Sequence, residues 1–426
     1  MMQQFDHPER AKWDTLCQRP VMESEKMLSA VQSVMDNVRL RGDRALIDLT
    51  ARFDGVQLET LLYPVPENCA IDKELADAIT LAWGNIHRFH SAQAEISTPI
   101  ETTPGVVCWR KSLPIQRVGL YVPGGSAPLF STLLMLGIPA IIAGCKQIVV
   151  CTPPTKSGGV DPTILYVSNL LGLKHIYTIG GAQAIAAMTF GTETIPKVDK
   201  IFGPGNQYVT LAKQLAQQQG VAIDMPAGPS EVLVIADSSC NPSFVAADLL
   251  SQAEHGADSQ VILLSDNENV LAEVKAQLAV QLRALPRKAT AVKALENSRS
   301  ILLRDMTMAM DFSNHYAPEH LILATDRADE LAALVTQAGS VFIGHYSCES
   351  AGDYASGTNH TLPTNGYARA YSGVSLDSFV KKVTFQKLTA DGLRNIGPTI
   401  ERMAAAEQLD AHRNAVTIRL NTLNND

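Results

Sequence analysis

The stretch EVLVIADSSCNPSFVAADLLSQAEHGADSQVILL, residues 231–264, contains the pattern that decides the fold. Two short apolar runs, EVLVIAD and SQVILL, flank the segment NPSFVAADLLSQAEHG, whose pattern is that of a helix. In this segment Asn241 is the expected N-cap, Pro242 takes the first helical position and Gly256 is the stop signal. A strand, a helix and a second strand in this order are typical of a parallel α/β unit.

Similar apolar runs recur through the middle of the chain and alternate with helical patterns. The predicted strands are RVGLYV (117–122), QIVVC (147–151), HIYTIG (175–180), KIFG (200–203), EVLVIAD (231–237), SQVILL (259–264), SILLR (300–304), HLILA (320–324) and SVFIG (340–344). The stretches 1–115 and 376–426 have mostly helical patterns and little strand signal. Within 24–55, apolar residues from Met27 to Leu49 recur at helical spacing. We therefore expect two open parallel α/β sheets with helical segments at both ends of the chain.

The composition limits the class of protein. The chain has 426 residues, of which 46% are hydrophobic and 18% charged, so it can bury a large core and needs no long disordered segment. Its net charge of -8 provides no basic surface for nucleic acid. The seven cysteines form no CxxC pair, and the N-terminus has no apolar secretory segment, which together predict a cytoplasmic protein.

One charge-free run, residues 119–145, raises the question of a membrane span. Proline and glycine residues interrupt the run, and they argue against a continuous transmembrane helix. They include Pro123, Gly124, Gly125, Pro128 and Pro139. We therefore expect no contact with a membrane.

Two short motifs bring imidazole next to oxygen donors. Gln252 and His255 lie three residues apart at the end of a predicted helix, so they share a face and can converge on one point. A helix C-terminus also favours histidine for its charge alone, which is the simpler explanation. Glu319 and His320 begin a predicted strand and can serve one site only if the strand starts after Glu319. Exposed surface residues are the alternative for this pair.

Two further motifs lie near the C-terminus. SAGDYASGTNHTLPTNG, residues 350–366, has the composition of a loop and contains Asp353 and His360. It is either a ligand-binding loop or a plain connection. AAAEQLDAHRNAV, residues 404–416, contains Glu407 and His412. These two point apart on a continuous helix, so they converge only if the helix breaks near Asp410 or if they act from different directions. A solvated helical face is the alternative.

Three glycine turns, YVPGGSAP, TIGGAQAIAAM and FGPGNQYVT, each stand between a predicted strand and a helix. Backbone N–H groups at such turns, followed by a helix N-terminus, can bind phosphate. None of the turns is GxGxxG, and no acidic residue stands at the usual offset for a ribose. Together the three turns predict a nucleotide site.

Eight motifs in one order give the sequence a specific resemblance. They are GLYVPGG, GGAQAIAA, KIFGPGN, DMPAGPSEVLVIAD, DLLSQAEHG, YAPEHL, SAGDYASGTNHTLPT and AAAEQLDAHRNAV. In this order they resemble the histidinol dehydrogenase family from about residue 24 to the C-terminus. The resemblance implies an α/β fold with two incomplete Rossmann-like parallel-sheet domains and small helical N- and C-terminal extensions. The implied boundaries are 1–23 for the N-terminal extension, 24–120 plus 230–368 for the first domain, 121–229 for the second domain and 369–426 for the C-terminal extension.

The same resemblance implies the site. The residues matching the family's zinc ligands are Gln252, His255, Asp353 and His412, for one zinc ion per subunit. Glu319 and His320 match its two bases. Ser230 and Glu407 match its substrate contacts, together with His320 and the zinc ligands. Tyr121, Gln183 and Asn206, one from each glycine turn, match its NAD contacts.

The implied activity is the zinc- and NAD-dependent oxidation of L-histidinol to L-histidine through L-histidinaldehyde, the last step of histidine biosynthesis. The family is dimeric, and its C-terminal residues reach the active site of the neighbouring subunit. We therefore expect a homodimer in which Glu407 and His412 complete the neighbour's site. No role follows for His360 or for the cysteines.

Two other functions compete with this one. The first is an aldehyde oxidation in which a cysteine thiolate attacks the substrate, with Cys145, Cys151 and Cys348 as candidates. No histidine stands near any of them in a recognisable pattern, which argues against an activated thiol. The second is a zinc-stabilised nucleotide-binding regulator without catalysis, in which Glu319 and His320 have no chemical role.

Overall fold

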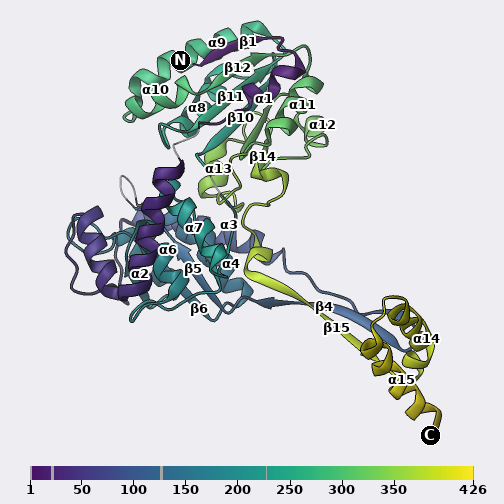
Figure 1. Ribbon diagram of the computed structural model, residues 1–426. Helices are drawn as coiled ribbons and strands as arrows, with labels where there is room; N and C mark the ends of the chain where they lie inside the picture. The colour runs from purple at the N-terminus through teal and green to yellow at the C-terminus, as the bar shows by residue number, and fades with distance from the viewer. Residues whose placement is uncertain (1, 21–23, 125–127, 227, 426) are drawn as a thin grey trace. The chain divides into compact units, whose positions relative to one another are not determined.

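The computed structural model describes residues 2–20, 24–124, 128–226 and 228–425. The chain forms two compact units, one made of Met1–Gln93 with Ile115–Phe379 and the other of Ala94–Pro114 with Val380–Asp426. The first unit contains two six-stranded sheets, and the second contains a three-stranded sheet with two helices (Figure 1). The expected α/β class, with parallel sheets covered by helices, is confirmed.

The first sheet is parallel throughout. Its strands, in spatial order, are β1 (Gln3–Asp6), β12 (Arg299–Leu302), β11 (Gln260–Ser265), β10 (Glu231–Ala236), β13 (His320–Ala324) and β14 (Ser340–Ile343). Helices α8 (Pro242–Ala253), α9 (Glu268–Ala284) and α10 (Lys288–Glu296) cover one face, and α1 (Trp13–Leu16), α11 (Met306–Tyr316) and α12 (Ala328–Ala332) cover the other. Every residue of β10 and β11 is buried, which explains why both read as unbroken apolar runs.

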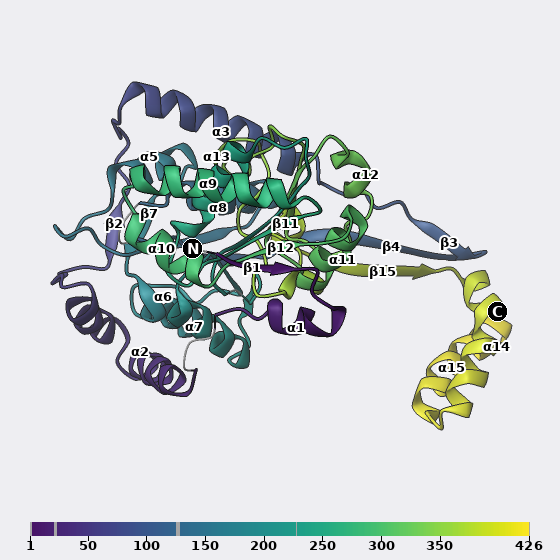
Figure 2. The same cartoon turned by 90° about the horizontal axis from the view of Figure 1, so that it is seen from above.

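The second sheet is parallel except for its edge strand β2. Its strands, in spatial order, are β2 (Leu62–Pro64), β7 (His175–Thr178), β6 (Gln147–Thr152), β5 (Arg117–Tyr121), β8 (Lys200–Phe202) and β9 (Ala222–Ile223). Helices α2 (Ser24–Phe53), α6 (Gly181–Phe190) and α7 (Gln207–Gln218) pack on one face, and α3 (Lys73–Ser91), α4 (Phe130–Ala143) and α5 (Pro162–Leu170) on the other (Figure 2). All nine strands predicted from apolar runs are present in the two sheets.

The predicted N-terminal helix is confirmed as α2, but it bends at Gly42, which has φ 52° and ψ -134°. This positive-φ conformation strains residues that have a β-carbon, so glycine is favoured there, and the Glu193 carboxylate occupies the space that a β-carbon would take. The same carboxylate accepts a hydrogen bond of 2.8 Å from the backbone N–H of Asp43. The bend therefore lies where the loop before β8 caps the second half of α2.

Residues 376–426 are mostly helical, as expected, but the second unit also contains a strand that the sequence analysis did not predict. This unit consists of β3 (Ile100–Thr103), β4 (Val106–Pro114), β15 (Val380–Leu388), α14 (Ala390–Ala406) and α15 (Asp410–Asn425). β15 pairs antiparallel with β4 over nine residues, from Val380 opposite Pro114 to Leu388 opposite Val106. Lys381, Lys382, Gln386 and Lys387 interrupt the apolar residues of β15, and its partner strand is far away in the sequence. The strand therefore lacks both the apolar run and the local turn that made the other strands recognisable.

The strands also divide the chain differently from the expected boundaries. Residues 1–23 were expected to form a separate helical extension, but β1 pairs with β12 and extends the first sheet. Residues 24–120 were grouped with 230–368, but β2 and most of β5 lie in the second sheet. β5 stands between β6 and β8, where its buried residues need a strand on each side. Residues 369–379 belong to the first unit, because Phe379 packs in the core of the second sheet.

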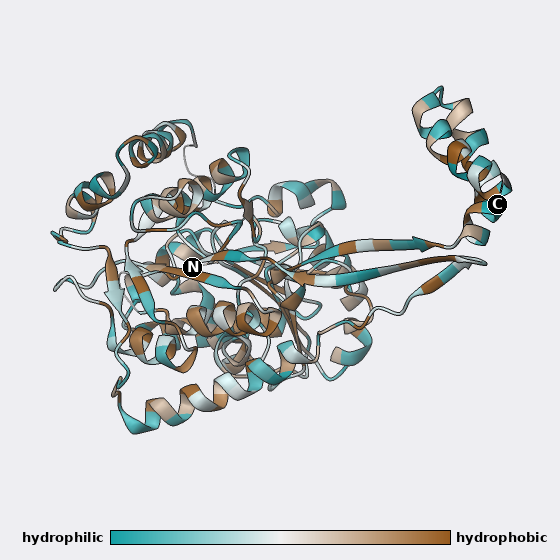
Figure 3. Cartoon of the chain, turned by 90° about the horizontal axis from the view of Figure 1, so that it is seen from below, coloured by the Kyte–Doolittle hydropathy of each residue, from teal (hydrophilic) through white to brown (hydrophobic). Residues whose placement is uncertain are grey.

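The charge-free run 119–145 contains the end of β5 and the 14-residue helix α4, which Gly144 ends in a left-handed conformation. No helix within the described ranges is long and apolar enough to cross a membrane. Along most helices hydrophobic and hydrophilic residues occur together, as expected for segments that cover a sheet on one side only (Figure 3).

Candidate functional site

The predicted bases lie at the amino end of the first sheet. β10 begins at Glu231 and β13 at His320, and Val232 is paired with His320, so the two strand starts are adjacent. α8 runs back from the far end of β10, and its last turn brings Gln252 to the same edge. Ligands of open α/β sheets usually bind at the carboxyl ends of the strands, so this position is unusual.

The backbone of Glu231 contacts three of the predicted site residues. Its N–H donates a hydrogen bond of 2.8 Å to Oε2 of Glu319. Its carbonyl oxygen lies 3.0 Å from Nδ1 of His320 and accepts a 3.1 Å hydrogen bond from Nε2 of Gln252. Glu319 precedes the first residue of β13, so the condition under which Glu319 and His320 can face one site is met. Oε2 of Glu319 and Nδ1 of His320 are 3.6 Å apart.

The contact with the carbonyl oxygen also determines which ring nitrogen of His320 carries the proton. Because Nδ1 faces an acceptor, the neutral imidazole has its proton on Nδ1 and its lone pair on Nε2. Nε2 is buried, has no hydrogen-bond partner among the described residues and lies 3.7 Å from Oδ1 of Asp353. The lone pair of His320 therefore faces the space next to Asp353.

Burial and neighbouring carboxylates shift the pKa values of both predicted bases. Burial raises the pKa of Glu319 to about 8, although the charge of His320 acts in the opposite direction. Burial disfavours the charged form of His320, but the carboxylates of Glu349, Glu319 and Asp353 outweigh it and hold its pKa well above the usual value. Strong shifts of adjacent buried groups are typical of catalytic sites.

Next to the bases, His255, Glu349 and Asp353 place one possible metal-binding atom each within 4.8 Å of the others. Glu349 and Asp353 are four residues apart on α13 (Glu349–Tyr354) and so project from one side of this short helix. The stretch from Ser350 was expected to be a loop, but its first part is this helix. His255 follows the end of α8, and its backbone N–H donates to the carbonyl oxygen of Gln252.

Two acceptor groups at this place lack partners. Oε1 of Gln252 and both carboxylate oxygens of Glu349 are buried and have no hydrogen-bond partner in the described part of the chain. Gln252 and Glu349 are each 1% exposed, so water cannot replace the missing donors at the surface. Buried acceptors without donors are costly, and a cation is one group that satisfies them. The sequence analysis missed Glu349, whose only signal is its spacing from Asp353.

His360, to which the sequence analysis assigned no role, supports α13. Its Nδ1 lies 3.0 Å from the carbonyl oxygen of Asp353, and its Nε2 lies 3.2 Å from the hydroxyl of Thr132. Burial lowers the pKa of His360, so the neutral ring is favoured. With the proton on Nδ1, the ring donates to the end of α13 and helps to hold Asp353 in place.

The remaining substrate contacts expected from the sequence lie in different parts of the chain. Ser230 is half-buried and directly precedes β10, next to Glu231. Glu407 and His412 are exposed residues of the second unit. Glu407 is the C-cap of α14, and α15 begins at Asp410. Gln408 between them has φ 61°, so the helix break that these two residues require is present.

The three expected NAD contacts line one cavity of about 940 Å³ beside the second sheet. Tyr121 ends β5, Gln183 lies in the first turn of α6 after β7, and Asn206 caps α7 after β8, so all three stand at carboxyl ends of strands. The hydroxyl of Tyr121 accepts a hydrogen bond of 3.1 Å from Gly181 N–H, and burial raises the pKa of Tyr121 to about 12. α2 also lines the cavity, which the sequence analysis did not foresee.

Neither Cys145, which is half-buried, nor Cys151, which is buried, has the environment of an activated thiol. Cys151 is 0% exposed and burial raises its pKa, while burial raises that of Cys145 to about 11. Cys348 is exposed at the start of α13. All seven cysteines lie in the described ranges and are free thiols.

Comparison with known proteins agrees with this arrangement. The sequence profile of the family described as histidinol dehydrogenase matches residues 17–420. A histidinol dehydrogenase of Bacteroides thetaiotaomicron is 56% identical over 99% of this chain and 100% of its own length. A chloroplastic histidinol dehydrogenase of Arabidopsis thaliana is 52% identical over 96% of this chain and 88% of its own length. The crystal structure of histidinol dehydrogenase from Elizabethkingia anophelis superposes with a TM-score of 0.97 at 59% identity, covering 99% of both chains. The chain therefore belongs to the histidinol dehydrogenase family.

Proposed function

We propose that this protein is a zinc- and NAD-dependent homodimeric enzyme that oxidises L-histidinol to L-histidine through L-histidinaldehyde, the last step of histidine biosynthesis. Family membership makes the chain an oxidoreductase. One observation carries the finer proposal. Glu319 and His320, whose pKa values are both shifted, contact the backbone of the same residue, Glu231. Beside them, His255, Glu349 and Asp353 form a group of possible metal ligands. Oε1 of Gln252 and the carboxylate oxygens of Glu349 are buried and have no hydrogen-bond partner among the described residues.

The donors fit zinc. Zinc binds imidazole nitrogen and carboxylate or amide oxygen, and catalytic zinc sites keep a position open for the substrate. Gln252, His255 and Asp353 would hold the ion, with His412 of the neighbouring subunit as the fourth ligand. When bound, zinc supplies positive charge that offsets the carboxylates around His320 and orients the imidazole and amino nitrogens of the substrate.

In the first oxidation the alcohol loses one proton and one hydride. His320 takes the hydroxyl proton at Nε2, because its Nδ1 is held by the carbonyl oxygen of Glu231. Ser230, next to Glu231, is placed to contact the substrate, and Glu407 of the neighbouring subunit is expected to contact it as well. The carbon–hydrogen bond breaks as the carbonyl bond forms, and the product of this step is the aldehyde.

In the second oxidation water adds to the aldehyde before a second hydride leaves. Glu319 takes a proton from this water at the carboxylate oxygen, since a carboxylate beside a buried imidazole is a suitable base. The resulting hydrate anion loses a hydride and becomes the carboxylic acid, which then releases its proton to form the carboxylate of histidine. Two NAD molecules are therefore reduced for each histidinol.

The cavity beside the second sheet is the proposed NAD site. NAD bound there would supply the hydride acceptor for both oxidations. α6 begins at Gly181, whose N–H donates to the Tyr121 hydroxyl, and the N-cap Gly180 has no side chain to cap the N–H groups that follow. Uncapped N–H groups at a helix start suit a pyrophosphate, while Tyr121, Gln183 and Asn206 provide neighbouring polar contacts. The cavity also has the size typical of small-molecule sites.

Two rival functions can be tested in the same assay, which follows NADH absorbance after histidinol and NAD are added. We expect two NADH per histidinol, loss of turnover after chelation and recovery when zinc is restored. Circular dichroism should stay unchanged on chelation, because the donors come from elements with their own buried cores. No NADH from zinc-loaded protein would favour the non-catalytic regulator. Turnover lost in Cys145→Ala, Cys151→Ala or Cys348→Ala would favour the thiolate mechanism.

A further inference from the structure

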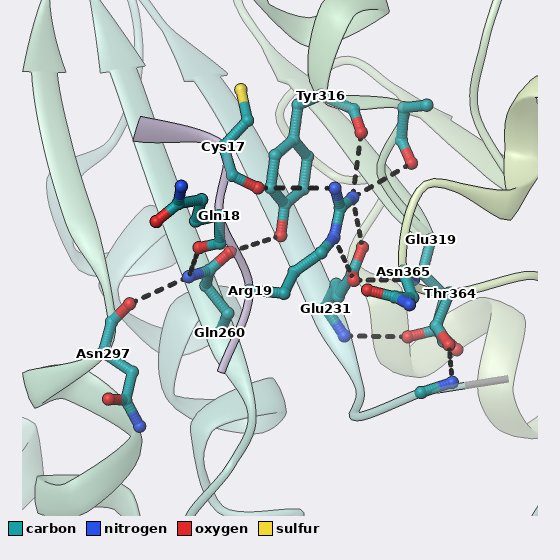
Figure 4. A network of polar contacts seen from close by, with 12 residues as sticks. Cys17, Gln18, Arg19, Glu231, Gln260, Asn297, Tyr316, Glu319, Thr364 and Asn365 are labelled. Carbon is teal, nitrogen blue, oxygen red and sulfur yellow. Dashed lines mark hydrogen bonds and ion pairs between the residues drawn. The ribbon is translucent and has the colours of Figure 1, made fainter. Parts of the chain in front are cut away.

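A buried ion pair lies behind the two predicted bases. Nε of Arg19 donates to Oε1 of Glu231 over 2.7 Å, and an Nη2 hydrogen bond of 3.0 Å reaches Oε2 (Figure 4). The two side chains are 10% and 1% exposed. The backbone N–H of Asn365 donates a third hydrogen bond, of 2.7 Å, to Oε1. The Glu231 carboxylate is thus held in one orientation from two sides.

Glu231 connects this pair to the chemistry through its own backbone. Arg19 holds the side chain of Glu231. The backbone N–H of Glu231 contacts Glu319, and its carbonyl oxygen contacts His320 and Gln252. A rotation of the Glu231 peptide units would therefore move all three contacts at once. Glu231 is the first residue of β10, and the sheet holds the peptide unit before it through the N–H of Gln260, which donates over 3.1 Å to the carbonyl oxygen of Ser230. The bonds to the Glu231 side chain add a second restraint on the same backbone.

Arg19 is itself fixed by α11 and by the sheet. Its Nη2 donates to the carbonyl oxygen of Tyr316 over 2.8 Å, and its guanidinium carbon lies 3.9 Å from the centre of the Tyr316 ring. The Tyr316 hydroxyl donates to Oε1 of Gln260 over 2.8 Å. Nε2 of Gln260 in turn donates over 3.0 Å to the carbonyl oxygen of Gln18, next to Arg19. The N-terminal segment is thus held at the Gln18 backbone and through the Arg19 side chain, as Figure 4 shows.

Stability alone does not account for this arrangement. Buried ion pairs cost desolvation energy, and well-packed apolar residues of similar size often give equal or higher stability. Glu231, the acidic member of the pair, is the residue whose backbone contacts both Glu319 and His320. We propose that Arg19 and Glu231 are positioning residues, which hold the Glu231 backbone so that Glu319 and His320 keep their orientation toward the substrate. This inference rests on the proposed function, since it concerns the same two bases.

The test compares Arg19→Met with the double variant Arg19→Met/Glu231→Met. Arg19→Met leaves a buried carboxylate without its partner, so we expect lower thermal stability and a kcat reduced roughly 10- to 100-fold. KM for histidinol and zinc content should change much less than kcat. Neither residue is expected to touch the substrate or the metal, although Gln252, one of the four expected zinc ligands, contacts the Glu231 backbone. In the double variant the unpaired charge is gone, so stability should recover while kcat stays low.

Arg10→Met is the matched control. Arg10 lies in the same N-terminal segment and pairs with Asp311 of α11, but both side chains are exposed. We expect wild-type kcat from this variant. All variants are assayed at a temperature where circular dichroism shows them to be folded.

Three outcomes overturn the inference: kcat recovers together with stability in the double variant, Arg19→Met has the kcat of Arg10→Met, or KM and zinc content change as much as kcat. If Arg19→Met does not fold, Arg19→Lys provides the same comparison, because lysine keeps the charge and loses the two parallel hydrogen bonds. Its kcat should lie below that of wild type at wild-type KM, and a wild-type kcat would contradict the inference. Wild-type protein that forms no NADH would instead refute the proposed function.

Discussion

Nε2 of Gln252 donates a hydrogen bond to the carbonyl oxygen of Glu231, and Oε1 of the same amide is buried with no hydrogen-bond partner among the residues that the structure describes. The amide is thus held by its nitrogen, and its oxygen remains available as an acceptor. An amide oriented in this way before a ligand arrives loses little freedom when it binds a cation.

Gln252→Ala should lower zinc affinity by more than about 10-fold, because the substitution removes an oriented oxygen donor. Competition with a chromogenic chelator measures the affinity directly. Gln260→Ala is the matched control, since Gln260 is equally buried at 1% but has its amide oxygen and nitrogen bonded within the protein. Equal zinc loss in both variants would show that the effect of Gln252 is structural.

Glu349→Gln should also weaken zinc binding, although Glu349 is not among the ligands that the resemblance implies. The change keeps the shape of the side chain and removes a negative charge beside His255 and Asp353. Glu254→Gln, next to His255 but at the C-cap of α8, controls for the change in net charge. The same chelator competition applies, and unchanged affinity in Glu349→Gln would mean that this carboxylate does not face the metal.

The two oxidations should depend on different bases. Glu319→Gln should still convert histidinol to the aldehyde but lose aldehyde oxidation by roughly 100-fold or more. His320→Asn should be impaired with histidinol and retain activity when histidinaldehyde is supplied. Stopped assays of each half-reaction separate the two effects. The reverse pattern, with Glu319→Gln active only on the aldehyde, would overturn this division.

Activity should require two subunits if His412 acts in the neighbouring site. His412→Ala and Glu319→Ala are each expected to be inactive, but a mixed dimer has one site with both defects and one with neither. Random exchange makes about half of the dimers mixed, so about a quarter of all sites should recover. Absence of recovery, with exchange proven by differently tagged subunits, would place His412 in the site of its own subunit.

Away from the site, Asp237 should make stability depend on pH. Partial burial opposes its charge, but hydrogen bonds from Ser239 and Thr325 keep the pKa of this carboxyl below its ordinary value. A depressed pKa stabilises the folded state above the unfolded pKa, and this contribution is lost as the pH falls through the folded value. Asp237→Asn should therefore lower Tm at pH 7, with a loss of about 1 kcal/mol in the free energy of unfolding. The difference in Tm from the wild type should shrink below about pH 4. Thermal scans at both pH values test this; a constant difference would contradict it.

Much of the fold follows from the sequence because the central strands are buried on both faces. β10 and β11 read as continuous apolar runs for this reason, and their positions were predicted within one or two residues. β15 was missed because polar residues occupy much of its length and its pairing partner β4 is remote in the sequence. β1 is short and half-exposed at the edge of its sheet, so it has no comparable pattern.

The site was predictable only where local spacing or family motifs marked it. Glu319 and His320 are neighbours in sequence, but whether both face one site depends on where β13 begins, which composition does not reveal. Glu349 was missed because no side chain caps α13, so nothing marks the start of that helix. The contact between Arg19 and Glu231 joins residues 212 positions apart, and no local rule connects them.

The amino-end location of the bases also has an electrostatic consequence, because helices that follow parallel strands point their C-termini toward that edge. α8 ends there, and the partial negative charge of its last carbonyl groups favours cations such as a divalent metal or a protonated amine. α6 and α7 instead point their positive N-termini at the cavity beside the second sheet, which favours an anionic dinucleotide. The helix dipoles at the two places thus have opposite signs: those at the predicted bases disfavour phosphate, and those at the cavity beside the second sheet disfavour a metal ion.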